Sequence, residues 1–425
     1  MKQLLYRGIF WRGLNYLTVF LVTITVARIF QAGDSGIINY TLNNLALVVL
    51  VISFSLESAT SYYIAKGTLP PSELLGITLI MSGWCLMIAY PIIYWILRIE
   101  DGTALTGCLL YCGGVVLCNY FNALFYVHNH YVFPNLTTVS LNLLVVAICI
   151  VFRQQFLSWD ASVFIVFYGA AFLINGVTLA TGYIHRYNCK ISWPKFTTAK
   201  KVFWFAALAL TGNIIFFLVY RVDYWFVQHN SSAADLGNYI QVSKLGQIFL
   251  LLPGVIGTVV FARTASDNSH DHLRDLQVLS RLLLVIYAMV VIILLISGDR
   301  LFLFVYGSTF HSMYWPFLLL SPGILSLSTL TLITAYNAGQ GNIALNVRGA
   351  LLALLVIVAG NAIFSAKYGI YAAAAISSVG YIVSQVYIMW MIKRRNSNLK
   401  VLAFFIPGPA DLIIIKNLFS SNEKN

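Results

Sequence analysis

Charged residues are scarce in this chain: Asp, Glu, Lys and Arg make up 9% of its 425 residues. Ordinary soluble domains contain roughly 25%. Hydrophobic residues account for 60% of the chain, which excludes water as its main solvent. The apolar runs also lack the two-residue alternation of membrane barrel strands, so we expect the spanning elements to be helices.

Other absences narrow the function. The sequence contains no Gly-Lys-Ser/Thr phosphate-binding loop, and the polar segments between its apolar runs are short. Both features argue against a nucleotide-driven pump or an enzyme with a large extramembrane active site. The six cysteines lie mostly in apolar runs, where they act as small hydrophobes. No His or Cys set completes a metal site, so we expect neither a metal nor a cofactor.

Apolar runs of spanning length recur along the chain. A spanning helix needs about 20 mostly apolar residues, and we predict an all-α polytopic membrane protein with about twelve such helices. The expected ranges are 8–30, 37–65, 74–97, 105–127, 134–152, 161–184, 202–228, 236–262, 279–298, 312–338, 343–365 and 370–392. The first run has full length and no small-residue cleavage site, so we expect it to remain as the first span.

Positive charges support this topology independently. With the amino terminus inside, nineteen of the 26 Lys and Arg fall on inner segments, as the positive-inside rule requires. The other seven are Arg28, Arg98, Arg153, Arg300 and Lys367 on outer segments, and Arg221 and Lys244 within spans. We therefore expect both termini in the cytoplasm. The net charge of +12 indicates topology and contact with anionic lipid rather than nucleic-acid binding.

A basic segment near the middle of the chain divides it into two halves. We expect an amino-terminal six-helix bundle over residues 1–184, a cytoplasmic linker over 185–201, and a second six-helix bundle over 202–393. The tail over 394–425 is expected in the cytoplasm, either as an interfacial helix or without structure. The two halves would be parallel repeats, with substrate bound between them.

Few ionisable side chains fall inside the predicted spans, where each costs about 2.5 to 3.5 kcal/mol. They are Glu57, Arg221, Asp223 and Lys244, with Arg28 at the outer end of the first span. Two interpretations stay open. In one, Asp223 or Glu57 pairs with Lys244 or Arg28 to hold helices together. In the other, Arg221, Lys244 and Arg28 line a cavity that attracts phosphate or pyrophosphate.

An ion-coupled cycle would need a carboxylate in the same cavity. Asp223 and Glu57 are the candidates for binding a proton or a sodium ion. Pro253 lies inside the predicted eighth span, where proline removes one backbone hydrogen bond and permits a kink. A moving hinge and a static bend both fit this residue.

Several short motifs recur in the order and spacing of a known family. They are Ser55-Leu56-Glu57-Ser58-Ala59-Thr60, Arg221-Val222-Asp223, Leu236-Gly237-Asn238-Tyr239, Leu252-Pro253-Gly254, Tyr306-Gly307-Ser308-Thr309-Phe310, Asn337-Ala338-Gly339-Gln340-Gly341 and Tyr368-Gly369-Ile370-Tyr371. Through most of its length the chain resembles the polysaccharide biosynthesis transporters, the Wzx-type flippases of lipid-linked O-antigen and capsule units. It departs from that pattern at Ile38, where tyrosine is common, and at Ala262, where proline is common.

The resemblance implies the fold of the multidrug and oligosaccharidyl-lipid exporter superfamily, with two six-helix bundles in a V around a central cavity. It also implies a function: moving an undecaprenyl-pyrophosphate-linked oligosaccharide from the inner to the outer leaflet of the bacterial cytoplasmic membrane by alternating access. The cargo would be an O-antigen, capsule or exopolysaccharide repeat unit. A glycan polymerase and an initiating glycosyltransferase are the partners that the resemblance implies.

Three other functions compete with this interpretation. An ion-coupled multidrug exporter would have the same fold, although cationic cavity residues argue against cationic drugs. A membrane glycan polymerase or ligase would need a large outer loop, and no predicted outer loop is long enough. A purely structural membrane subunit fits the paired halves and the buried charges less well.

Overall fold

The computed structural model describes residues 2–188, 190–266, 271–396 and 399–406. Within these ranges all regular structure is helical, and ten helices are long and apolar enough to cross a membrane. The prediction of an all-α polytopic membrane protein is confirmed. Cys189 and the tail from residue 407 onward lie outside the described residues.

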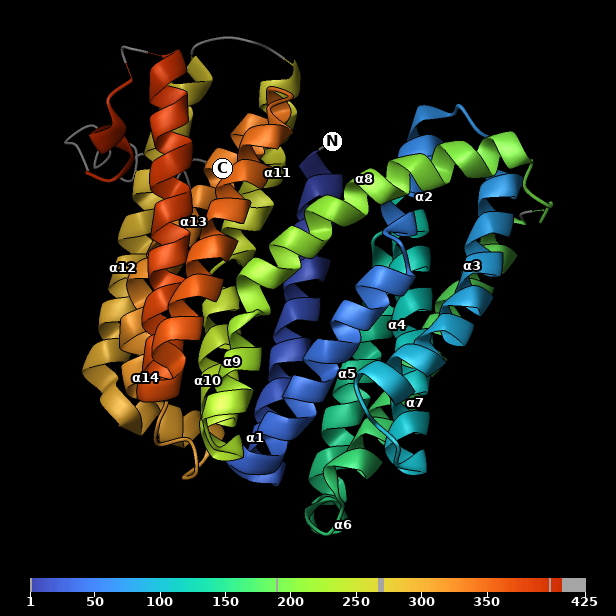
Figure 1. Cartoon of the computed structure of the whole chain (residues 1–425). Coiled ribbons are helices and arrows are strands. Elements are labelled where there is room, and N and C mark those ends of the chain that lie inside the picture. The colour runs from blue at the N-terminus through green and yellow to red at the C-terminus, as the bar shows by residue number, and fades with distance from the viewer. Residues whose placement is uncertain (1, 189, 267–270, 397–398, 407–425) are drawn as a thin grey trace, which may run out of the picture. The chain divides into compact units, whose positions relative to one another are not determined.

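Two of the ten helices contain a break that makes each of them two crossings. α1 (Lys2–Ile52) is interrupted at Gln31, whose φ of 57° is left-handed, and the chain turns back at that end (Figure 1). α14 (Ile343–Arg395) is interrupted in the same way at Gly369, where φ is 53°. Counting both arms of these two helices raises ten to twelve crossing-length segments among the described residues, as the apolar runs predicted.

The chain divides into two compact units. Unit 1 comprises Met1–Phe217 and Val305–Phe310, and unit 2 comprises Leu218–Phe304 and His311–Asn425. Residues 202–217 therefore belong to unit 1, whereas the sequence-based division placed them in the second half. The reason is packing: Val202 and Ala206 are fully buried in the hydrophobic core of unit 1.

Unit 1 is held together by a close contact between two of its helices. Its elements are α1, α2 (Leu56–Lys66), α3 (Pro71–Pro91), a π-helical turn (Ile92–Ile96), α4 (Gly102–Val127), α5 (Val132–Val151), α6 (Arg153–Leu157), α7 (Ala161–Tyr187) and most of α8 (Phe196–Arg221). A Cβ atom at Gly107 of α4 would lie 2.6 Å from the backbone nitrogen of Val166 in α7. Small residues let membrane helices approach this closely.

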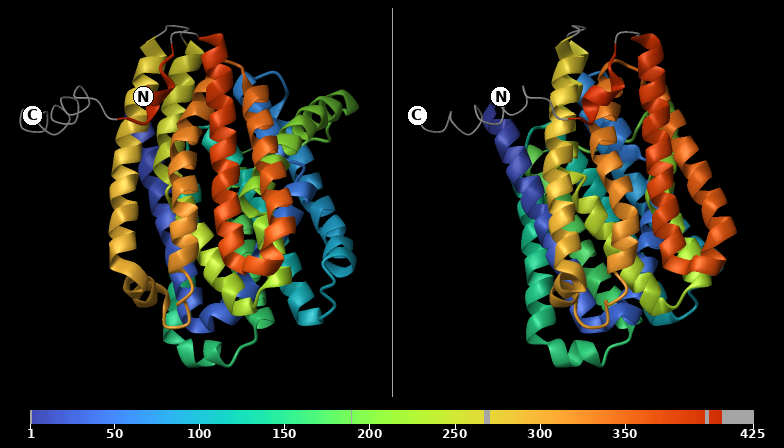
Figure 2. Two further views of the ribbon diagram at one scale, coloured as in Figure 1. Left: turned by 60° about the vertical axis from the view of Figure 1, so that its left-hand side comes forward. Right: turned by 90° about the vertical axis from the view of Figure 1, so that its left-hand side faces the viewer.

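Unit 2 relies on hydrogen bonds between helices. Its elements are α9 (Asp223–Asn230), α10 (Ala233–Ile248), α11 (Leu251–Ser266), α12 (Asp271–Tyr306), α13 (Tyr314–Gly339), α14 and a short turn of 3-10 helix (Val401–Phe404). The two arms of α14 lie side by side in both views of Figure 2. Ser326 of α13 donates to Gln385 of α14 at 2.6 Å, and Asn337 of α13 donates to Asn346 of α14 at 3.0 Å. Such bonds replace the water that a bilayer lacks.

Three predicted spans are interrupted rather than continuous. The second crossing ends at Ile52, and α2 begins only at Leu56, because Phe54 and Ser55 have left-handed φ angles of 54° and 51°. A left-handed residue cannot continue a right-handed helix. The expectation that Glu57 lies within one continuous span is therefore wrong, because Glu57 lies in the first turn of α2. The seventh span is assigned as two helices, α8 and α9, although Val222 between them keeps right-handed helical angles.

Pro253 lies in the first turn of α11, and the eighth span is interrupted just before it. The last bonds before the break run from the Phe249 nitrogen to the Gly246 oxygen and from the Leu250 nitrogen to the Gln247 oxygen, at 3.2 and 3.0 Å. Such three-residue bonds tighten the last turn of a helix. The break falls where the proline ring would clash with the carbonyl four residues earlier. Movement at this break stays a prediction.

We expect Gly107→Val to destabilise the protein, because the added carbons would overlap the α7 backbone. Overpacking of this kind costs about 1 to 3 kcal/mol. Thermal unfolding of the purified protein in detergent measures the effect. The matched control is Gly83→Val in α3, where a Cβ atom would meet nothing within 4 Å. Equal losses in the two variants would contradict the close contact.

Candidate functional site

The expected site residues divide between the two units. Arg221, Asp223 and Lys244 belong to unit 2, whereas Arg28 and Glu57 belong to unit 1. Nothing in the sequence marks this division, and Arg28 is predicted in one cavity with the other two basic residues. The site that can be built from contacts within one unit is therefore that of unit 2.

Asp223 is the buried carboxylate of unit 2. It begins α9 and is only 1% exposed. Its Oδ2 atom accepts hydrogen bonds from the Tyr239 hydroxyl of α10 at 2.5 Å and the Ser377 hydroxyl of α14 at 2.7 Å. Its Oδ1 atom is buried and has no hydrogen-bond partner among the described residues. A bare carboxylate oxygen is costly in a low dielectric, so binding a proton or a cation there would be favourable.

Two basic side chains of unit 2 lie near one another. Arg221 is the last residue of α8 and Lys244 lies in α10, and both are half-buried. Their positive charges lie close enough to act on one another. Like charges within electrostatic reach raise the local potential, so an anion bound near both would relieve their repulsion. Arg221 and Asp223 are two residues apart and point in different directions around the helix axis.

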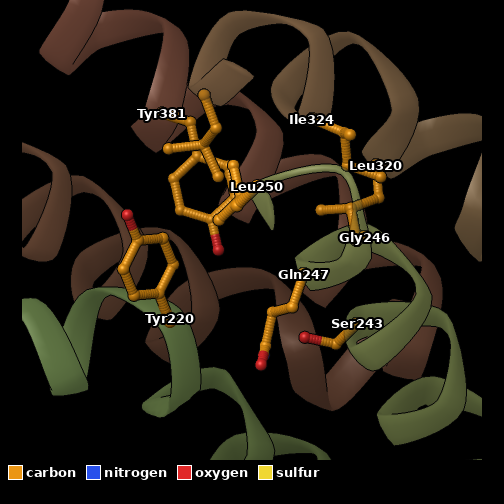
Figure 3. A pocket seen from close by; sticks show the side chains of 9 residues that line it. Tyr220, Ser243, Gly246, Gln247, Leu250, Leu320, Ile324 and Tyr381 are labelled. Carbon is orange, nitrogen blue, oxygen red and sulfur yellow. The ribbon is translucent and has the colours of Figure 1, made fainter. Parts of the chain in front are cut away.

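A pocket in unit 2 is lined by the residues that directly precede these two cations, Tyr220 and Ser243. It is a small, partly open hollow with a cavity volume of about 10 Å³. Its lining consists of Tyr220, Ser243, Gly246, Gln247, Leu250, Leu320, Ile324, Leu327 and Tyr381. In Figure 3 the two tyrosine rings lie on one side of this space and the polar side chains of Gln247 and Ser243 on the other. The pocket thus combines aromatic and aliphatic faces with an amide and hydroxyl groups.

Tyr224 connects this pocket to Asp223. It is 2% exposed, and its hydroxyl lies within electrostatic reach of Ser243 and Gln247, which both line the pocket. Its ring packs edge-on against Tyr239 with 5.9 Å between the ring centroids, and Tyr239 in turn donates to Asp223. A change in the charge of Asp223 would therefore affect the pocket through the packed side chains of Tyr239 and Tyr224.

The two unit 1 candidates have different surroundings. Arg28 is exposed, and its Nε donates to the Val305 carbonyl at 2.8 Å, which ties α1 to the end of α12. Glu57 is half-buried, with a buried Oε2 atom that has no hydrogen-bond partner among the described residues. Its charge acts on Cys85 and Tyr120. The structure therefore gives Arg28 a packing contact and leaves Glu57 with an unsatisfied oxygen.

Comparisons with known proteins match the chain by structure alone. No protein-family profile matches it, and no curated protein sequence does. The lipid II flippase MurJ in an inward closed conformation matches with a TM-score of 0.72 and 14% identity, over 99% of this chain and 93% of that one. The fold is that of MurJ and the MATE transporters.

Two MATE structures extend this comparison. An inward-facing multidrug resistance MATE transporter of the MOP superfamily has a TM-score of 0.65 and 13% identity, over 90% of this chain and 95% of that one. The MATE transporter VcmN from Vibrio cholerae, in its bent form, has a TM-score of 0.63 and 12% identity, over 95% and 98%. At such identities the likeness extends to the MurJ/MATE fold alone, and the Wzx-type resemblance stays a prediction.

Several residues of the site escaped sequence reasoning. Tyr239 lies in a motif that carried the resemblance, but nothing in the sequence marked its hydroxyl as a partner of Asp223. Ser377 is 154 residues from Asp223 and is one serine among many. Tyr220 and Tyr381 could not be singled out among 25 tyrosines. In each case the missing information is which helices of the MurJ/MATE fold are neighbours.

We expect Tyr239→Phe to lower the free energy of unfolding by about 2 kcal/mol, because hydrogen bonds to charged groups are worth about 1.5 to 3 kcal/mol. Chemical denaturation in mixed micelles measures the loss. The control is Tyr126→Phe, which removes a bond at 3.2 Å to the neutral amide of Asn135 and should cost less. A smaller loss for Tyr239→Phe than for Tyr126→Phe would argue against a charged Asp223.

Proposed function

We propose that the chain is a flippase that moves a lipid-linked anionic glycan across the bacterial cytoplasmic membrane by alternating access. The cargo would be an undecaprenyl-pyrophosphate-linked oligosaccharide, as an O-antigen, capsule or exopolysaccharide repeat unit. Translocation would run from the inner to the outer leaflet. The full-length likeness to the lipid II flippase MurJ supports a lipid-linked cargo.

The observation that carries the proposal is a pair of neighbouring cations in unit 2, each of which directly follows a residue that lines a polar and aromatic pocket. A pyrophosphate group has several acceptor oxygens, which suit the charge-assisted hydrogen bonds of an arginine and a lysine. Aromatic rings with nearby amide and hydroxyl groups suit a sugar, because its CH faces pack on rings while its hydroxyl groups form hydrogen bonds. Arg221 and Lys244 would hold the pyrophosphate, with the adjacent sugar towards Tyr220 and Tyr381. A third positive charge from Arg28 of unit 1 stays a prediction.

Asp223 is the carboxylate that we propose for ion coupling. Its Oδ1 atom is the unsatisfied oxygen that a proton or sodium ion would occupy, and Tyr224 links that position to the pocket. Binding of the ion would remove or compensate a buried negative charge and so change the balance between two arrangements of the surrounding helices. Glu57, with its own unsatisfied oxygen, is the second candidate.

The product of this step would be a lipid-linked glycan exposed on the outer leaflet. A glycan polymerase or a ligase is the class of enzyme that would consume it. A transferase that attaches the first sugar phosphate to the lipid would start the supply on the inner leaflet.

An ion-coupled exporter of amphiphilic compounds is the second candidate function. The observation that favours it is the apolar part of the pocket, formed by Leu320, Ile324 and Leu327 together with two tyrosines. MATE multidrug transporters share the fold. Cationic drugs would be repelled by Arg221 and Lys244, so a neutral or anionic compound is the chemistry that this alternative requires.

The deciding experiment compares the leaflet distribution of undecaprenyl-pyrophosphate-linked glycan in cells with and without this chain. We expect the glycan to accumulate on the inner face when the chain is absent and to return to the outer face with the wild type. If the glycan reaches the outer face but stays unpolymerised when the chain is absent, the chain would be assigned as a polymerase instead of a flippase. An unchanged distribution together with altered drug resistance would favour the exporter.

Removing either cation should reduce export. We expect Arg221→Ala and Lys244→Ala each to lower the rate of glycan appearance at the surface about 10- to 100-fold, because a hydrogen bond to a charged group is worth about 1.5 to 3 kcal/mol. Surface glycan labelling in complemented deletion cells measures the rate. Lys367→Ala removes an exposed cation of the same unit and serves as the control. Normal export in both site variants would refute the anionic site.

Asp223→Asn should abolish the dependence of export on an ion gradient, because the amide cannot exchange a proton or neutralise a cation. Export is measured before and after collapse of the proton gradient and, separately, of the sodium gradient. Asp235→Asn is the matched control, since Asp235 accepts a hydrogen bond from Ser232 at the start of α10. If Asp223→Asn still responds to a gradient, Glu57→Gln becomes the variant to test.

A further inference from the structure

The segment that leads into α8 is fixed to the start of α3. Ser192 donates its backbone N–H to the Ser72 carbonyl at 3.3 Å and its hydroxyl to the Ser72 hydroxyl at 3.0 Å. A Cβ atom at Gly76 would lie 2.2 Å from the Ser192 carbonyl oxygen, so the contact requires glycine there. The segment therefore has a defined position on unit 1.

Glu73 of α3 caps the beginning of α8. Its Oε2 atom accepts the backbone N–H of Lys195 at 3.2 Å, and its carboxylate lies within electrostatic reach of the Thr198 side chain. Both Glu73 and Thr198 are buried, with 7% and 5% exposure. A carboxylate at a helix amino terminus satisfies free N–H groups and complements the helix dipole. The first turn of α8 is therefore anchored by a residue of another helix.

This anchored segment presents large apolar side chains outward. Trp193 is 85% exposed, Phe196 is 83% exposed and Trp204 is 72% exposed. Phe196, Lys200 and Trp204 are four residues apart, which places them on one face of α8. Aromatic rings interleaved with lysines are typical of the membrane–water interface, where the ring and the lysine stem contact lipid and the ammonium group reaches the headgroups.

The charge of this segment has one sign. Its cations are Arg186, Lys190, Lys195, Lys200 and Lys201, and all five are exposed. The sequence has no Asp or Glu between Asp160 and Asp223. Glu73 lies next to Lys195, but its carboxylate is buried and caps α8, so it adds no exposed negative charge. The exposed surface is therefore positive and apolar together.

Helix length places the same segment at the edge of the membrane. The apolar helical stretch Phe196–Asn230 has 35 residues, which corresponds to about 50 Å at 1.5 Å per residue. The hydrocarbon core is only about 30 Å thick. A stretch of this length extends beyond the core unless it is strongly tilted, and its end with the exposed side chains of Lys200 and Lys201 is costly to place in lipid.

We propose that residues 190–204 form a docking surface for the headgroups of anionic phospholipids, with Trp193, Phe196 and Trp204 inserted at the acyl boundary. Lys195, Lys200 and Lys201 bind the lipid phosphates. The surface goes beyond the transport function proposed above and does not depend on it. Because α8 carries the chain from unit 1 into unit 2, a lipid bound here acts on the connecting helix.

The test uses the full chain in phosphatidylcholine nanodiscs that contain increasing fractions of headgroup spin-labelled phosphatidylglycerol. The fluorescence of Trp193 and Trp204 is obtained by subtracting the signal of the Trp193→Phe/Trp204→Phe variant from that of the wild type. Quenching of this difference signal reports on this surface alone. We expect half-maximal quenching at a lower fraction of labelled phosphatidylglycerol than of labelled phosphatidylcholine. Lys195→Gln/Lys200→Gln/Lys201→Gln should raise the midpoint for phosphatidylglycerol at least about fivefold, since one lysine at an anionic surface accounts for about that factor.

A matched variant removes three positive charges elsewhere: Lys393→Gln/Arg395→Gln/Lys400→Gln. Its midpoint should equal that of the wild type. Equal quenching by both lipids in the wild type, or an unchanged midpoint in the first triple variant, would overturn the proposal. Absence of quenching by either lipid would also overturn it and would indicate that water or a protein partner covers the surface. None of these outcomes bears on glycan export, so the two proposals fail separately.

Discussion

The hydrocarbon core of a bilayer offers no hydrogen bonds, and every polar group placed there must find its partner within the chain. The Asp223 carboxylate shows the constraint most clearly, because two hydroxyls from two different helices converge on one of its oxygens. Ser326 with Gln385 and Asn337 with Asn346 meet the same requirement between α13 and α14. Among the described residues, the carboxylate oxygens that are buried without a hydrogen-bond partner belong to Asp223 and Glu57, and binding an ion there would stabilise a buried negative charge.

Breaks in the helices obey the same constraint. Two left-handed residues, Phe54 and Ser55, interrupt the second crossing. Nearby carbonyl groups that have no partner within a continuous helix accept hydrogen bonds from side chains of other helices. Tyr120 donates its hydroxyl to the Ser53 carbonyl at 2.9 Å, and the Cys85 thiol donates to the Ile52 carbonyl at 3.2 Å. Left-handed residues other than glycine cost about 1 to 2 kcal/mol each. This tyrosine and this cysteine stabilise a conformation that the local sequence alone would not adopt.

Much of the fold could be predicted from the sequence, because hydrophobic length is a local property. The twelve crossings follow from apolar runs of about 20 residues. The breaks at Gln31 and Phe54 could not be predicted, since neither residue type favours a left-handed φ. The site was predictable in part: Arg221, Asp223 and Lys244 were recognisable as costly charges in apolar surroundings. Which hydroxyls meet Asp223, and that Arg28 contacts Val305, depend on helix neighbours far apart in the sequence.

The position of α8 has a consequence for how this chain can evolve. Residues 202–217 pack in unit 1, whereas the end of the same helix, including Arg221, belongs to unit 2. A genetic exchange at the basic linker would separate α8 from the core into which Val202 and Ala206 pack. A crossover that respected the packing would have to fall in mid-helix, near residue 217, where no loop tolerates a mismatch. Recombination between relatives should therefore seldom exchange whole halves, and the two units are expected to share one line of descent.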